Sequence, residues 1–186
     1  MLTDKAATVT ERESAGSLEG YLRHMAFGRS RRNHRRMCVV HLEQDGPGLV
    51  VSTCVNAAHA RVETEEGSVP VGRAPERVGA AVLAALDACS WLDAFDLRGR
   101  SPRDWPAFRA SGERSVRAFE NGWAAVDVEG TDEENRAWTL QAALGDPQDL
   151  YLAATVAAAA TAPSELGELV LHLDDQRRRI SSALGY

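Results

Sequence analysis

The sequence predicts an α+β fold in which an antiparallel unit of three strands and one helix is duplicated and forms a pseudo-twofold single domain. Three observations lead to this prediction. Residues 74–83 read APERVGAAVL and residues 162–171 read APSELGELVL, an offset of 162 − 74 = 88. The same offset aligns three strand-like runs before each of these segments, in the same order and at the same spacing. Each of the two segments also has one apolar stripe at helical spacing, to bury against a sheet.

The length of 186 residues suits one compact domain, or two small halves that share a core, and such a chain can bury roughly 70% of its unfolded surface. We expect residues 1–16 to be disordered and residues 17–90 to form the first strand-and-helix unit with an N-terminal arm. Residues 91–115 would form an aromatic-rich connector, and residues 116–186 the second unit. The polar N-terminus lacks the apolar core of a secretory signal, which predicts a cytoplasmic protein. The excess of Ala and Arg over Lys is typical of high-GC bacteria.

In the first unit, residues 38–44 (CVVHLEQ) and 48–55 (GLVVSTCV) are rich in apolar and β-branched residues, which favours strands. The sequence DGPG between them can close a tight hairpin. A third run, RVETEEGSVPV, covers residues 61–71. The following helix is predicted to begin at Ala-Pro, because Pro75 in the first turn needs no N–H donor and Glu76 suits the helix dipole.

In the second unit the corresponding runs are residues 123–130 (WAAVDVEG), 137–144 (AWTLQAAL) and 149–158 (DLYLAATVAA), and the loop TDEEN joins the first two. The second helix begins again at Ala-Pro. Glycines at matching positions, Gly79 and Gly167, lie inside the two predicted helices. Each costs about 1 kcal/mol relative to Ala, so a repeated glycine predicts a repeated close approach of helix to strand or of helix to helix.

The connector holds more large apolar residues than a free linker needs, which predicts that it packs over one end of the core. Ser101, followed by Pro102 and Asp104, is a predicted helix start. We expect Trp123 and Trp138, which fall in strands, to lie in the core. The candidate anchors for a partner protein are Trp91, Trp105 and Phe108, since aromatic side chains dominate interface energies. The alternative is that these three side chains cap the ends of the core.

An arginine-rich arm at residues 28–36 (GRSRRNHRR) is the strongest local charge feature. Its candidate contacts for phosphate or carboxylate groups are Arg29, Arg31, Arg32, Arg35 and Arg36. The arm could bind a nucleic acid or a nucleotide, or it could be a solvated basic lead into the first strand. The chain as a whole has a net charge of −6, which disfavours general binding to nucleic acid or to an anionic membrane.

No motif in the sequence points to catalysis, a metal or a cofactor. Cys38, Cys54 and Cys89 are widely separated and include no CxxC pair, so we expect free thiols. The five histidines never fall in HxH or HxxxH spacing. The chain lacks GxSxG and P-loop spacings. We therefore expect no catalytic residues, no metal site and no cofactor, although an enzyme without a recognisable motif stays an alternative.

The order of three strands and one helix, duplicated, resembles two kinds of bacterial protein. The stretch LYLAATVAAAATAPSELGELVLHLDD at residues 150–175 resembles the closing strand and helix of type III secretion chaperone-like domains. The pattern also resembles the immunity proteins of polymorphic toxin systems. Either resemblance implies a non-enzymatic module that docks another protein: a secreted client, a toxin or a complex subunit. The alternative prediction is a nucleic-acid or nucleotide binder that uses the arginine-rich arm.

Overall fold

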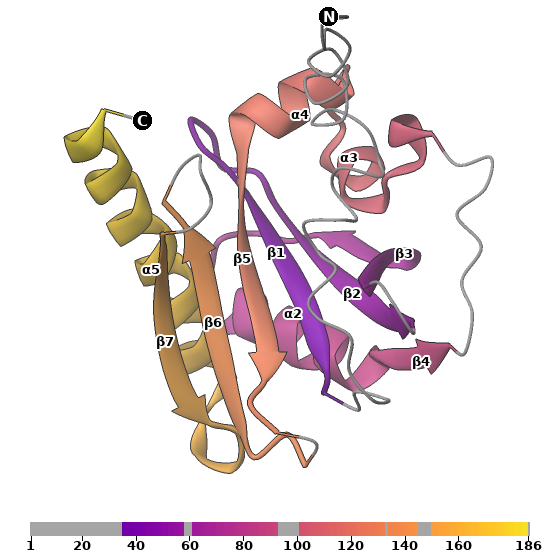
Figure 1. Cartoon of the computed structure of the whole chain (residues 1–186), viewed down its shortest axis with the longest axis vertical. Coiled ribbons are helices and arrows are strands. Elements are labelled where there is room, and N and C mark those ends of the chain that lie inside the picture. The colour runs from indigo at the N-terminus through magenta and orange to yellow at the C-terminus, as the bar shows by residue number, and fades with distance from the viewer. Residues whose placement is uncertain (1–34, 58–60, 93–100, 133, 145–149, 186) are drawn as a thin grey trace, which may run out of the picture.

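The computed structural model describes residues 35–57, 61–92, 101–132, 134–144 and 150–185. Within these ranges seven strands form one sheet that helices flank (Figure 1), which confirms the predicted α+β class. The strands are β1 (Met37–Glu43), β2 (Leu49–Ala57), β3 (Arg61–Pro70), β4 (Ser90–Leu92), β5 (Trp123–Gly130), β6 (Ala137–Ala143) and β7 (Tyr151–Ala157). The helices are α2 (Pro75–Ala88), α3 (Pro106–Ser111), α4 (Val116–Gly122) and α5 (Pro163–Leu184), with 3-10 turns η1 (Pro102–Asp104) and η2 (Ala158–Ala160).

The sheet has the strand order β3-β2-β1-β5-β6-β7, with β4 beside the end of β2. Only the β2–β4 pair is parallel among the described pairings; the others are antiparallel. The two predicted units therefore meet through their first strands, β1 and β5, at the centre of the sheet. The third strand of each unit, β3 or β7, lies at an outer edge.

Helices α2 and α5 lie side by side on one face of the sheet (Figure 1). The close approach predicted from the two glycines occurs between them. A Cβ atom on Gly79 would lie 1.6 Å from the carbonyl oxygen of Pro163, and one on Gly167 would lie 1.9 Å from the carbonyl oxygen of Pro75. Only glycine allows the two backbones this separation, so both glycines are required by helix-to-helix packing.

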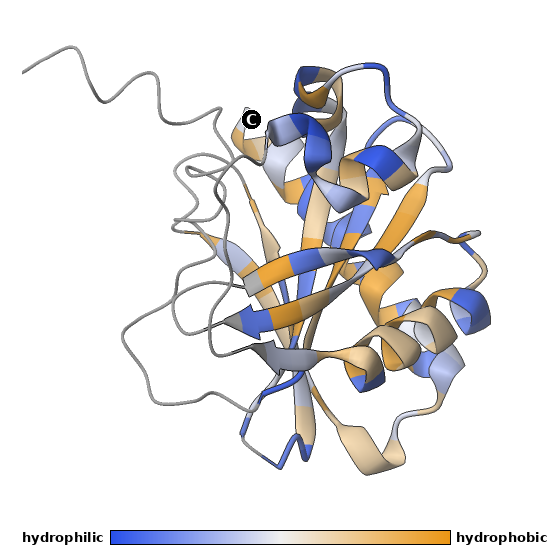
Figure 2. Ribbon diagram, turned by 90° about the vertical axis from the view of Figure 1, so that its right-hand side faces the viewer, coloured by the Kyte–Doolittle hydropathy of each residue, from blue (hydrophilic) through white to orange (hydrophobic). Residues whose placement is uncertain are grey.

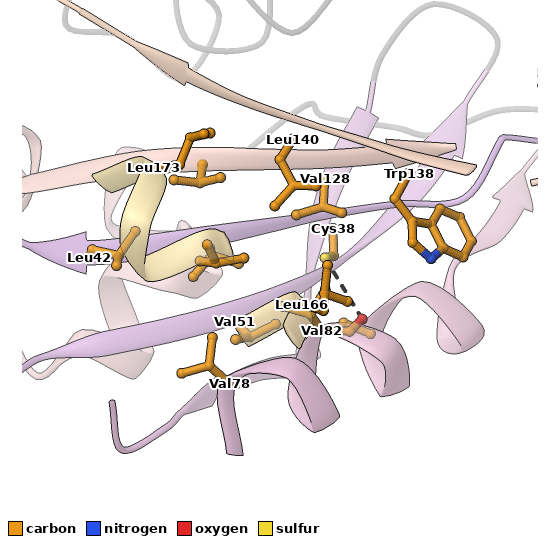
Figure 3. Packing of buried hydrophobic residues seen from close by; sticks show 14 of the residues in the cluster. Cys38, Leu42, Val51, Val78, Val82, Val128, Trp138, Leu140, Leu166 and Leu173 are labelled. Carbon is orange, nitrogen blue, oxygen red and sulfur yellow. Dashed lines mark hydrogen bonds between the residues drawn. The ribbon is translucent and has the colours of Figure 1, made fainter. Parts of the chain in front are cut away.

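The main core fills the space between this helix pair and the sheet (Figure 3). Alternate residues of the central strands point into it, Val40 and Leu42 from β1 and Val126 and Val128 from β5 among them. Figure 2 shows the resulting alternation of apolar and polar residues along the strands. Trp138 is buried in the same core, as its place in a strand predicts.

The described residues of the connector after 101 pack on the opposite face of the sheet and contribute to a second, smaller core. This second core consists of Val50, Trp105, Ala107, Phe119 and Trp123. The predicted helix start at Ser101 is present, but it opens a 3-10 turn and then the short helix α3, because Pro106 begins a new helix after Trp105. The sequence predicts that the connector lies over one end of the core, whereas its described residues after 101 contribute to this separate cluster on a face of the sheet.

Residues separated by 88 positions have equivalent partners. In the β1–β5 pairing Cys38 lies opposite Val128 and Val40 lies opposite Val126, and adding 88 to 38 and 40 gives 126 and 128. Val82 and its counterpart Val170 are both fully buried in the main core. The glycine contacts between α2 and α5 are likewise reciprocal. These contacts fit the offset found in the sequence; the duplication itself stays a prediction.

Candidate functional site

The three predicted aromatic anchors differ in how deeply their side chains are buried. Trp105 is buried in the second core, with its ring edge-on to Phe119 at a centroid distance of 4.8 Å. Phe108 is half-buried at the border of this core, 6.1 Å from the ring of Phe119. Trp91 is half-buried in β4. The side chain of Trp105 therefore belongs to the fold, and partner binding through Trp91 and Phe108 stays a prediction.

The described part of the arginine-rich arm contacts acidic groups of its own chain. The guanidinium group of Arg36 forms an ion pair with Asp87 at the end of α2, and that of Arg35 lies 3.7 Å from the carboxylate of Glu129. The other three candidates, Arg29, Arg31 and Arg32, lie outside the described residues. Both described arginines thus have intramolecular counterions.

A buried histidine and a buried glutamate meet beneath the connector. His41 Nε2 lies 2.8 Å from the Oε1 atom of Glu63, and the rings of Trp105 and Phe119 lie 5.8 Å and 5.4 Å from the imidazole. The pair joins β1 to β3 across β2 and lies against the second core. Sequence reasoning missed it, because the two residues are 22 positions apart and neither belongs to a motif. Both side chains are buried, so the pair links β1 to β3 inside the fold.

A second buried charge group holds the β1–β2 hairpin against α5. The carboxylate of Asp174 accepts hydrogen bonds from Arg177 and Arg178, and the latter also donates to the main-chain oxygen of Glu43 at 2.9 Å. Arg73 donates to the same oxygen at 2.7 Å. Burial and the neighbouring Arg178 guanidinium lower the pKa of Arg73. Because Arg73 and Arg178 donate hydrogen bonds to a main-chain oxygen of the hairpin, they hold the hairpin in place.

A surface hollow is lined by residues from several parts of the described chain. This hollow of about 290 Å³ lies between the β1–β2 hairpin, the end of β3 and α3, and Trp123 is among its lining residues. Among the described residues, no group of three or more His, Cys, Asp or Glu side chains is placed to hold a metal ion. No helix of the described chain is both long enough and apolar enough to cross a membrane.

The two edges of the sheet differ sharply in chemistry. The edge strand β3 has the sequence RVETEEGSVP, with four charged residues, a glycine and a proline, and its register with β2 shifts between Ser52 and Cys54. Helix α3 also packs against it, and Arg109 of α3 forms an ion pair with Glu65 at 2.7 Å. Charges, proline, irregular register and a covering helix are the features with which proteins block edge-to-edge pairing.

The opposite edge strand, β7, differs from β3 in sequence and in register. Its sequence YLAATVA carries no charge, glycine or proline, and it pairs with β6 in an unbroken register over all seven residues. Every second side chain of β7, beginning with Tyr151, is exposed. In the described chain β7 pairs with β6 alone. We refer to this side of β7 as the β7 edge.

Hydrogen bonding to β6 determines which main-chain groups the β7 edge presents. At one end of the pair Leu144 N–H donates to Leu150 C=O at 2.9 Å, and at the other Ala158 N–H donates to Arg136 C=O at 2.8 Å. In an antiparallel pair, hydrogen-bonded positions alternate. The even-numbered residues of β7 therefore bond to β6, and the odd-numbered residues direct their N–H and C=O groups outward.

Exposed apolar side chains gather at the start of this strand. Leu150, Tyr151 and Leu184 are each 56% exposed, a large value for side chains of this size. They lie at one corner, because the hydroxyl group of Ser181 donates to the main-chain oxygen of Leu144, whose N–H in turn donates to Leu150. The end of α5 and the start of β7 are thus held together. The candidate functional site is the β7 edge with this apolar corner.

No family model matches the chain, and no curated protein matches it. A solved structure of a protein of unknown function from Neisseria meningitidis has a similar fold, with a TM-score of 0.56 and 12% sequence identity. The match covers 80% of this chain and 98% of that chain. At this level of identity the likeness concerns the fold alone.

Proposed function

We propose that this chain is a non-enzymatic protein-binding module, and that its β7 edge receives an extended segment of a partner protein. One observation carries the proposal: β7 is an uncharged, regular edge strand on a sheet whose opposite edge is charged, irregular and covered. Strand addition to such an edge draws affinity from main-chain hydrogen bonds and specificity from alternate side chains. An edge left open in this way would otherwise be a hazard for aggregation.

The exposed corner at Leu150, Tyr151 and Leu184 supports the same proposal. Exposed apolar and tyrosine side chains beside an unpaired strand edge are suited to anchor a partner. Both bacterial classes that the strand order resembles act by holding another protein. We therefore propose a cytoplasmic bacterial protein whose partner is a secreted client, a toxin or a complex subunit. The aromatic connector remains a second candidate surface, through Trp91 and Phe108.

The nucleic-acid alternative has less support. The described arginines of the arm, Arg35 and Arg36, already have acidic partners in the chain, and the net charge is −6. Binding through the arm would fall steeply with salt, because neutralised phosphates release counterions. Titration of labelled single-stranded and duplex oligonucleotides at low and moderate salt tests this alternative, and an absence of binding at low salt eliminates it.

The experiment that tests the β7 edge is affinity capture from the native organism with three forms of the chain. The N–H of Ala153 points away from β6, so Ala153→Pro removes an outward donor and leaves the β6–β7 hydrogen bonds intact. The matched control, Ala153→Ser, keeps that N–H. We expect one partner to co-purify stoichiometrically with the wild type and with Ala153→Ser, and to be lost with Ala153→Pro.

If the folded Ala153→Pro variant retains the partner undiminished, the partner does not use the β7 edge. The connector is then tested by Phe108→Ala, whose side chain is half-buried, with circular dichroism to check folding. Trp105→Ala is a poor probe of binding because its side chain lies in the second core, where removal costs stability directly.

A further inference from the structure

We propose that, when no partner segment is bound, the β7 edge pairs antiparallel with the β7 edge of a second copy of this chain, so that the free protein is a dimer with one continuous sheet. This inference rests on the proposed function, because it assigns a second use to the same strand-accepting edge. Its consequence is regulatory: the partner segment and the second copy compete for one edge, and the monomer is the form that binds.

The antiparallel pairing of two β7 strands follows from the main-chain N–H and C=O groups that point away from β6. The outward main-chain groups belong to Tyr151, Ala153, Thr155 and Ala157, and the C=O of the last accepts a hydrogen bond from the Thr161 hydroxyl at 2.5 Å. The open stretch is therefore Tyr151 to Thr155. A twofold axis at its middle residue, Ala153, places the two copies of this stretch opposite each other and forms about six main-chain hydrogen bonds.

The side chains are self-complementary in this register. On the face away from the helices, the large Tyr151 lies opposite the smaller Thr155 of the second copy, and Ala153 lies opposite itself. On the helix face, Leu152 lies opposite Ala154, and neither is charged. A symmetric interface requires a surface that complements itself. Pairs of one large and one small uncharged side chain meet that requirement.

The middle of this interface contains no charged side chain. The strand carries no formal charge, so pairing brings no like charges into contact in the middle of the interface. The two copies nevertheless each carry a net charge of −6, which opposes their approach at long range. Added salt screens that repulsion, so we expect the dimer to strengthen with ionic strength, unlike binding to nucleic acid.

Sedimentation equilibrium of the purified full-length chain, over a range of concentrations, tests the dimer. We expect the wild type and Ala153→Ser to dimerise equally. Ala153→Pro should weaken the dimer by roughly thirty-fold or more, because the symmetric Ala153 pair loses two hydrogen bonds at once. A wild type that stays monomeric at several hundred micromolar overturns the inference, as does a dimer that Ala153→Pro leaves unchanged.

Disulfide crosslinking tests the register. In a Cys89→Ser background, which leaves the buried Cys38 and Cys54 as the natural cysteines, Ala153→Cys should form a covalent dimer on mild oxidation. A hydrogen-bonded antiparallel pair has its Cα atoms about 5.5 Å apart, within the range of a disulfide. The control, Ala125→Cys, is exposed on the inner strand β5 and should stay monomeric. Equal crosslinking at both positions contradicts the proposed register.

The outcomes for the two proposals are separable. A monomeric wild type that still captures its partner through Ala153-dependent contacts refutes the dimer alone. A dimer that fits all the expectations above, with no partner captured at any concentration, refutes the proposed function alone. If both hold, adding the captured partner should convert the dimer to a complex that contains one copy of this chain.

Discussion

Replacing Gly79 with alanine should force α2 and α5 apart and destabilise the protein. A Cβ atom there would lie 1.6 Å from the carbonyl oxygen of Pro163 and 2.5 Å from its carbonyl carbon. Ordinary van der Waals contacts of a Cβ begin at 3.4 Å, so the oxygen has to retreat by 3.4 − 1.6 = 1.8 Å if nothing else moves. The obstacle is main chain, and no change of rotamer relieves it.

The size of the effect follows from opposing contributions. Alanine gains up to about 1 kcal/mol in helix propensity over glycine. Overpacking typically costs about 1–3 kcal/mol, and moving the helices apart also loosens the contacts of Val82 and Val170 in the main core. Partial loss of core packing adds a cost of similar size. We expect the free energy of unfolding to fall by about 2–4 kcal/mol.

The reciprocal geometry sharpens the prediction. A Cβ on Gly167 would lie 1.9 Å from the carbonyl oxygen of Pro75, so Gly167→Ala should cost about as much as Gly79→Ala. One separation of the helices relieves both clashes. The double variant should therefore lose clearly less stability than the sum of the two single variants, since neighbouring sites that share a displacement are not additive.

Urea unfolding followed by tryptophan fluorescence, with the slope of the transition checked for constancy, measures these losses. The matched control is Gly122→Ala at the end of α4, where a Cβ has no heavy atom within 4 Å. We expect this control to leave stability unchanged or slightly higher. If Gly79→Ala is as stable as the wild type, or if the two single losses add in full, the reasoning about the helix contact is wrong.

Three further outcomes are expected. Val82→Asp and Val170→Asp should each cost several kcal/mol in urea unfolding, because each places an unpartnered charge in the main core; a tolerated charge at either site contradicts the packing. Asp174→Ala should cost about 3–5 kcal/mol by the same measurement, since it leaves a buried arginine without its counterion. Burial raises the pKa of the Cys38 and Cys54 thiols, so the folded state keeps protons that the unfolded state loses above about pH 8.5, and stability should fall as pH rises past that value. The fall should be smaller in Cys54→Ala.

Much of the local structure is predictable from the sequence. The run WAAVDVEG coincides with β5, and the Ala-Pro pairs mark the starts of α2 and α5. These predictions hold because strand and helix signals depend on residues a few positions apart. The repeated glycines also predicted a close approach of helix to strand or of helix to helix, since glycine inside a helix is costly unless packing requires it.

The candidate site shows where such reasoning stops. The uncharged run of β7 is visible in the sequence, but a strand of small apolar residues can as well lie inside a sheet. Its place at an edge depends on the pairing of β1 with β5, which puts the third strand of each unit outermost. The aromatic side chain of Trp105 illustrates the reverse case: it was a candidate anchor, and the fold buries it against Phe119.

The sequence by itself predicted the three strands and one helix of each unit, their order, and a close approach at the two helix glycines, because each depends on local spacing and backbone sterics. It predicted neither β4 nor α4, and it left open whether the glycines face a strand or a helix. The tertiary structure decided which strands became edges, which aromatics were buried, and that His41 meets Glu63 beneath the connector. Those outcomes depend on contacts between residues far apart in the chain. Pattern alone does not fix such contacts, because one apolar stripe can pack against any other of matching size.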